Sequence, residues 1–162
     1  MNQELFDLEK EEIQHKIKKA ANWFYWIAFL SIINSILNFD TPSNIGFRAG
    51  LGISQLVDGV IMEIFGSYNY YATIINVIIS LVIVFIGYQA RKANKTAFII
   101  GLNFYALDGI LFFYFNLWMS FAIHIFFLFL IYQGIPAINE LKELELDSNL
   151  NMPNIQTDKE IQ

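Results

Sequence analysis

Apolar segments long enough to cross a bilayer occupy most of the chain between residues 21 and 135. Five such segments are separated by short polar or charged breaks: 21–38, 45–65, 71–90, 96–116 and 119–134. Backbone groups inside hydrocarbon must find hydrogen-bond partners within their own segment, so segments of this kind fold as helices. Roughly twenty helical residues span the hydrocarbon core. The pattern therefore predicts an all-α, polytopic transmembrane helical bundle over 21–135.

Charged residues gather at the two ends of the chain and in one internal loop. Residues 1–20 alternate charges with Leu and Ile at helical spacing, which predicts an amphipathic N-terminal helix. Residues 136–162 predict an acidic, polar C-terminal tail, within which 137–147 can form one short amphipathic helix. The net charge of −5 and the lack of a basic stripe argue against nucleic-acid binding. With no cysteine, no HExxH motif and no phosphate-cradling glycine loop, we expect no metal site and no cofactor.

The placement of Lys and Arg bears on how many segments cross, because cytoplasmic loops carry an excess of these residues. If all five segments cross, the count is four against five, which gives no preference. If 45–65 instead enters and leaves on one side, the count is eight against one, and both termini are cytoplasmic. The eight are Lys10, Lys16, Lys18, Lys19, Arg91, Lys92, Lys95 and Lys142, and the one is Arg48. The charge rule thus favours four crossings and the length of 45–65 favours five, so we expect four to five membrane helices.

Two similar four-residue motifs occur fifty positions apart, Leu56-Val57-Asp58-Gly59 and Ala106-Leu107-Asp108-Gly109. At the same offset, 22–38 falls on 72–88 and Tyr68 falls on Trp118. One interpretation is a duplicated helical hairpin with one helix added. Chance similarity between apolar segments is the alternative.

Polar residues fall on one face of each predicted helix, which indicates a shared polar interior. An aspartate near the bilayer centre costs about 2.5–3.5 kcal/mol, so an intramembrane acid suggests a function. Counting ~1.5 Å per residue from the turn at Trp118 places Asp108 and His124 at similar depths. We therefore predict a polar, proton-binding cluster of Asp58, Asp108, His124, Asn34 and Asn76. Interhelical hydrogen bonding is the simpler explanation for these residues, and Gly46, Gly50, Gly52 and Gly59 are predicted to permit close helix packing.

Two membrane acids also suggest an intramembrane enzyme that uses paired Asp residues. The flanks of Asp58 and Asp108 do not match the Tyr-Asp and Gly-x-Gly-Asp contexts of intramembrane aspartyl proteases. The preferred function is therefore a small transporter- or channel-like unit or a membrane partner subunit, and it is more consistent with no enzyme activity. The paired-Asp enzyme and a purely structural helix-docking subunit remain as alternatives.

Several motifs carry a resemblance to a known group. These are 23–28 with 31–35, then 50–59, the basic loop 91–95 followed by Ala97-Phe98, 105–109, and His124. Together they resemble an uncharacterised family of small bacterial multi-pass integral membrane proteins. The resemblance implies the bacterial inner (cytoplasmic) membrane and a lipid bilayer as the surroundings. Because the predicted helices enclose little volume, we also expect a homo-oligomer or another membrane protein as a partner.

Overall fold

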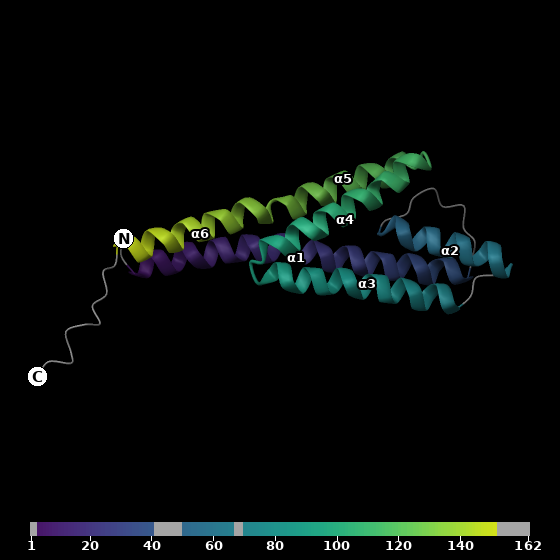
Figure 1. Cartoon of the computed structure of the whole chain (residues 1–162), viewed down its shortest axis with the longest axis horizontal. Helices are drawn as coiled ribbons and strands as arrows, with labels where there is room; N and C mark the ends of the chain where they lie inside the picture. Colours follow the sequence, from purple (N-terminus) through teal and green to yellow (C-terminus); the bar gives the residue numbers. More distant parts are fainter. Residues whose placement is uncertain (1–2, 41–49, 67–69, 152–162) are drawn as a thin grey trace, which may run out of the picture.

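The computed structural model describes residues 3–40, 50–66 and 70–151, and within these ranges every regular element is an α-helix. The helices are α1 (Gln3–Asp40), α2 (Gly52–Phe65), α3 (Tyr70–Arg91), α4 (Lys95–Tyr114), α5 (Trp118–Tyr132) and α6 (Gly134–Asn151) (Figure 1). Among the described residues, three stretches are long and apolar enough to cross a membrane: α3, α4, and Trp118–Leu150, which joins α5 to α6. Length and composition are thus consistent with a small multi-pass membrane protein, and the expectation of four to five membrane helices stays a prediction. The all-α prediction is confirmed.

α1 and α3 run antiparallel and form the longest contact in the molecule (Figure 1). Near one end Arg91 Nη1 donates to Asn22 Oδ1 at 3.2 Å. Toward the other end Asn76 Nδ2 donates to Ser35 Oγ at 2.9 Å. Because the pairs run in opposite directions along the two helices, α1 ends where α3 begins.

α4 and α5 form a second antiparallel pair, joined by a tight turn. Asn116 in this turn adopts a left-handed backbone conformation with φ 57°. At the opposite end α4 is capped by Asn94, whose side chain accepts from the Ala97 N–H at 3.2 Å. α4 lies against α3, and α5 lies against α1 as well as α4. The four helices therefore form one bundle.

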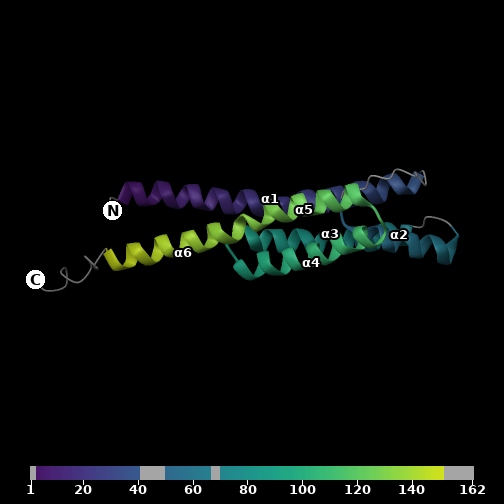
Figure 2. The same ribbon diagram turned by 90° about the horizontal axis from the view of Figure 1, so that it is seen from above.

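α1 and α6 extend beyond this bundle as a two-helix arm, residues 3–20 with Gly134–Asn151 (Figure 2). α1 has 38 residues and is about 57 Å long, well beyond the ~30 Å of hydrocarbon. The arm buries an apolar seam and carries ion pairs at its edges, including Lys10–Glu145 at 2.8 Å. The seam consists of Phe6, Ile13, Ile17 and Ala20 of α1 with Ala137, Ile138, Leu141 and Leu144 of α6.

The sequence suggested an amphipathic helix at 1–20 followed by a span at 21–38, and a single helix covers both from Gln3 onward. Neither Gly nor Pro occurs between Gln3 and Asp40, so nothing in the sequence interrupts the helix. Part of the predicted C-terminal tail is helical, because α6 extends to Asn151 and packs on α1.

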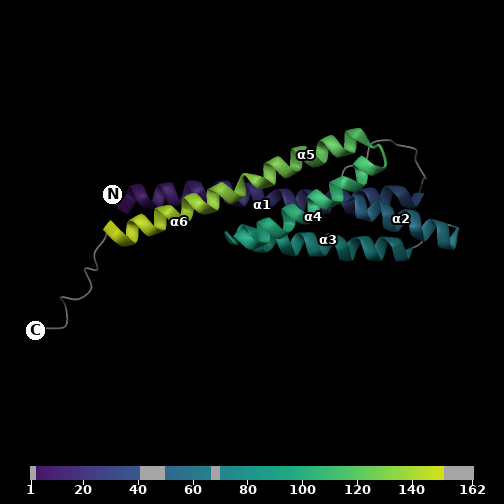
Figure 3. The same cartoon turned by 45° about the horizontal axis from the view of Figure 1, so that its top comes forward.

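α2 is a short helix that starts inside the bundle and ends at its far end (Figure 3). It has 14 residues, about 21 Å of helix, which is less than a bilayer crossing. It contacts α1, α3 and α4. Residues 45–49 of the predicted segment 45–65, with Gly46 and Arg48, lie outside the described residues.

Candidate functional site

The carboxylate of Asp108, on α4, lies directly at the N-terminus of α2. Its Oδ2 accepts the Gly52 N–H at 2.7 Å and its Oδ1 accepts the Ile53 N–H at 2.8 Å. Leu51, the N-cap residue of α2, provides no side-chain cap. The first N–H groups of a helix lack partners within the helix and carry partial positive charge. Asp108 therefore caps α2 from another helix and places an acceptor at its positive end.

His124 of α5 supplies a third contact to the same carboxyl group. Its Nε2 lies 3.0 Å from Asp108 Oδ2, and its Nδ1 lies 3.0 Å from the Ser120 carbonyl oxygen. A carbonyl oxygen only accepts, so Nδ1 must carry a proton. A further proton must then lie between Nε2 and Oδ2, since two lone pairs would otherwise face each other. The pair holds this proton either as carboxylate and imidazolium or as carboxylic acid and imidazole.

Two aromatic rings lie against the His124 imidazole. Tyr105 stacks on it with ring centroids 4.3 Å apart and an interplanar angle of 18°, and Phe112 lies 4.6 Å away. His124 has 0% exposure and Asp108 7%. The aromatic rings and the two backbone N–H donors thus surround the Asp108–His124 pair inside the bundle.

The chain that leads into α2 is seated in the bundle by close backbone contacts. Leu51 N–H donates to Ser31 Oγ at 2.8 Å, and that hydroxyl donates to the Ile27 carbonyl at 2.8 Å. Gly50 has φ +114°, and a Cβ there would lie 2.8 Å from the Ser31 backbone nitrogen. A Cβ at Gly52 would lie 2.9 Å from the Phe112 ring and 3.2 Å from the Asp108 carbonyl. Only glycine allows this approach at these two positions.

Asp58 lies in a second polar group farther along α2. Its Oδ1 accepts from Asn76 Nδ2 at 2.7 Å, and the same amide group donates to Ser35 Oγ. Asp58 is 2% exposed and Asn76 0%. On α1, next to Ser35, Asn34 has a buried Nδ2 for which the described residues offer no hydrogen-bond partner.

Two serines lie between the Asp58 group and the Asp108 group. Ser54 is one helical turn before Asp58 on α2, and Ser80 is one turn after Asn76 on α3. Since α2 and α3 run in opposite directions, the contact of Asp58 with Asn76 places Ser54 and Ser80 at one level. Both serines are buried, and among the described residues neither hydroxyl has a hydrogen-bond partner, nor does Asn76 Oδ1. Buried polar groups are normally paired, so these three atoms mark the contact between α2 and α3 as a polar interior with unsatisfied groups.

The structure places the two aspartates in separate hydrogen-bond groups. Asp108 contacts α2 at Gly52 and Ile53, while Asp58 is five residues beyond Ile53, a rise of about 7.5 Å. Asp108 also borders a groove of about 470 Å³ between α3 and α4, whose other lining residues are apolar. A shared-proton carboxylate pair, which the enzyme alternative needs, is not what this arrangement presents. No three of the described His, Asp and Glu side chains come together as a metal site.

Of the predicted packing glycines, Gly50 and Gly52 lie against neighbouring helices, whereas a Cβ added at Gly59 would have no atom within 4 Å. Sequence reasoning missed the two backbone N–H donors of α2 and the ring of Tyr105. The Gly-x-Gly spacing just before a helix was the signal for the former, and Tyr105, one turn before Asp108, was the signal for the latter.

Comparisons of the chain with models of protein families, with curated proteins and with solved structures gave no match.

Proposed function

We propose that the chain crosses the membrane four times, through α1, α3, α4 and α5, with α2 as a re-entrant helix. The antiparallel course of α1 and α3 supports this, because a full crossing by α2 would separate the end of α1 from the start of α3. All eight Lys and Arg among the described residues lie in the arm, in the turn between α3 and α4, or at the helix ends that flank this turn. That end is then the cytoplasmic one. The resemblance of the sequence supports a bacterial cytoplasmic membrane.

Single cysteine substitutions test this topology. Because the chain contains no cysteine of its own, labelling reports only the introduced residue. In vesicles of one orientation, an impermeant thiol reagent labels Glu11→Cys and Asn149→Cys from one side and Phe115→Cys from the other. Five crossings would instead place Glu11→Cys and Phe115→Cys together, opposite Asn149→Cys. That pattern would refute the re-entrant arrangement of α2.

We infer further that the Asp108–His124 pair is a proton-binding site and that the protein is a small proton-coupled transporter- or channel-like unit. One observation carries this proposal: a buried carboxyl group meets two N–H donors and an imidazole, so a single proton decides its charge. Histidine changes charge near physiological pH more readily than other side chains, and intramembrane ionisable groups mark proton paths. The Ser54 and Ser80 hydroxyls provide a polar route from this pair toward Asp58.

Nitrogen-15 NMR of labelled histidine tests the shared proton directly. The chain has two histidines, and exposed His15 is an internal reference for buried His124. We expect Asp108→Asn to change the Nε2 signal of His124 and to leave His15 unchanged. The matched control Glu63→Gln, which removes an exposed acid of α2, leaves both signals unchanged. Identical His124 spectra in Asp108→Asn and the wild type would show that no proton is shared.

Proton movement is measured in proteoliposomes that contain a pH-sensitive dye, under a potassium diffusion potential. We expect proton flux from the wild type and from Glu63→Gln, and none from folded, monodisperse Asp108→Asn. A wild type that moves no protons would refute transport while leaving the NMR result for the binding site intact.

A second candidate function is a structural subunit, because the same contacts fix α2 in place. The close approach of Gly50 to Ser31 and the cap on α2 favour a rigid docking element. This function predicts that Asp108→Asn leaves proton flux at the wild-type level and that Gly50→Leu disrupts assembly.

A further inference from the structure

A small hollow of about 190 Å³ lies where the four-helix bundle meets the arm. α1, the turn between α3 and α4, and Leu141 of α6 form its walls. Three of its lining residues are cationic: Lys18 of α1 and Arg91 and Lys92 of the turn. α3 ends and α4 begins at this turn, so with the four crossings proposed above the hollow lies at the level where the bilayer meets water.

No described carboxylate lies within 4.0 Å of these three cations. Arg91 instead donates to the amide oxygen of Asn22 and lies 5.9 Å from the Tyr25 ring centre. Lys92 Nζ lies 4.2 Å from the Tyr88 ring centre. Neutral groups thus position Arg91 and Lys92 and leave their charge available to an anion.

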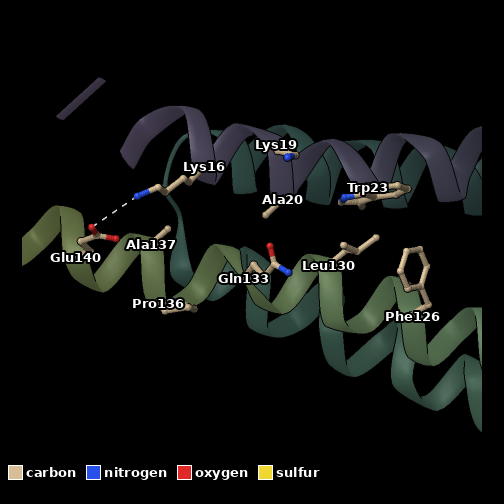
Figure 4. Close-up of a pocket in the computed structure, with 10 residues that line it drawn as sticks. All are labelled: Lys16, Lys19, Ala20, Trp23, Phe126, Leu130, Gln133, Pro136, Ala137 and Glu140. Atoms are coloured by element: carbon tan, nitrogen blue, oxygen red, sulfur yellow. Dashed lines mark ion pairs between the residues drawn. The ribbon is translucent and has the colours of Figure 1, made fainter. Parts of the chain in front are cut away.

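A larger crevice of about 580 Å³ lies at the same level on the other side of α1, against α5 and α6 (Figure 4). There Lys16 pairs with Glu12 at 3.1 Å and Glu140 at 4.0 Å. The hydrogen bond to Glu12 is the main cause that raises the pKa of Lys16. Of the lining charges only Lys19 is without a carboxylate within 4.0 Å among the described residues. The smaller hollow therefore has the stronger attraction for an anion, despite its size.

We propose that Lys18, Arg91 and Lys92 bind the phosphate of an anionic phospholipid headgroup. Three cations with no described carboxylate within 4.0 Å attract an anionic group, and Arg offers a planar fork of donors to phosphate oxygens. The start of α4, two residues after Ala93, adds the positive end of a helix beside the turn. The exposed ring of Tyr88 lies on the adjoining membrane face of α3, where it can contact the lipid. Basic pockets beside membrane helices are a known means of headgroup recognition.

Native mass spectrometry of the full chain in neutral detergent tests this site, with phosphatidylglycerol and phosphatidylcholine as the added lipids. We expect preferential retention of phosphatidylglycerol, weakened about fivefold in Lys18→Gln and in Lys92→Gln, as expected for one cation near a membrane surface. Lys19→Gln is the matched control, because it removes the same charge from the adjacent residue on the crevice side. Its affinity for phosphatidylglycerol stays within about twofold of the wild type.

Three results would overturn the proposal. Equal retention of the two lipids would show that charge is not recognised. Equal losses in Lys18→Gln and Lys19→Gln would show diffuse attraction rather than a site. Displacement of phosphatidylglycerol by millimolar inorganic phosphate would identify free phosphate as the ligand. Because all three side chains are exposed, the variants are expected to remain folded, and none of the results depends on proton binding at Asp108.

Discussion

Gly50 precedes α2 and Gly59 lies within it, and replacing each by alanine has opposite predicted effects on the free energy of unfolding. At Gly50 the backbone has φ +114°, and alanine there costs roughly 1–3 kcal/mol in backbone strain. Its Cβ would also lie 2.8 Å and 2.9 Å from the Ser31 backbone N and Cα. Because a backbone cannot rotate away as a side chain can, overpacking adds roughly 1–3 kcal/mol. Gly50→Ala therefore destabilises the protein by roughly 2–6 kcal/mol.

Gly59 lies inside α2, is exposed, and has no neighbouring atom within 4 Å of an added Cβ. Alanine has the higher helix propensity by about 1 kcal/mol, so Gly59→Ala stabilises α2 by up to that amount. The two variants add the same methyl group, and their effects should differ in sign.

Reversible unfolding in mixed micelles, followed by the fluorescence of the three tryptophans, gives both free energies on one scale. Amide exchange at Leu51 serves as a local readout, because its N–H donates to Ser31 Oγ. Faster exchange is expected in Gly50→Ala alone. Equal free energies of unfolding for the two variants would refute the close packing of residues 50–52 against α1.

Two further predictions concern the site and the arm. Asp108→Asn presents an NH₂ group to the Gly52 N–H or the Ile53 N–H, so one of these donors loses its acceptor. We expect the free energy of unfolding, measured in the same micelles, to fall by roughly 1–3 kcal/mol. An unchanged free energy of unfolding would contradict the capping of α2 by Asp108. In the arm, Ile13→Ala lowers the free energy of unfolding by roughly 2–5 kcal/mol because Ile13 is 1% exposed. Glu145→Gln breaks the exposed ion pair with Lys10 and lowers it by at most about 1 kcal/mol. If calorimetry ranks the two variants in the reverse order, ion pairs rather than the apolar seam stabilise the arm.

The helical class followed from the sequence because bilayer-length apolar segments have one backbone solution. α3 and α4 are the clearest cases, and their bounds differ from the predicted 71–90 and 96–116 by at most two residues. The length of α1 was harder to predict, since a change from charged to apolar residues at about Ala20 alters the surroundings of a helix without ending it.

The arm depends on pairing between the two ends of the chain. Leu141 and Leu144 meet Ile13 and Ile17 across more than a hundred residues, and each segment alone looks like a solvated amphipathic helix. Periodicity indicates an apolar face but not the partner that covers it.

For the candidate site, counting residues from the turn at Trp118 gave Asp108 and His124 similar depths. In the structure Asp108 Oδ2 and His124 Nε2 lie 3.0 Å apart. The position of α2 could not be predicted by counting residues. Its start is determined by contacts of Gly52 and Ile53 with Asp108, more than fifty residues away. Hydrophobic periodicity assigns a length to an apolar segment, and it carries no information about a carboxylate on another helix that determines where the segment begins.

On the proton-binding proposal, the position of Asp108 couples the location of the shared proton to the position of α2. When the Asp108–His124 pair is an ion pair, the two bonds from the Gly52 and Ile53 N–H groups are charge-assisted; when the proton moves to the carboxyl group, they become ordinary bonds. Charged hydrogen bonds contribute roughly 1.5–3 kcal/mol and neutral ones roughly 0.5–1.5 kcal/mol, so the two bonds together differ by about 2 kcal/mol. A coupling of this size changes the population of a displaced α2 by roughly thirtyfold, within the usual range for linked sites. On the same proposal, because α2 also carries Ser54 and Asp58, a displacement of α2 would expose the buried polar groups that it shares with α3.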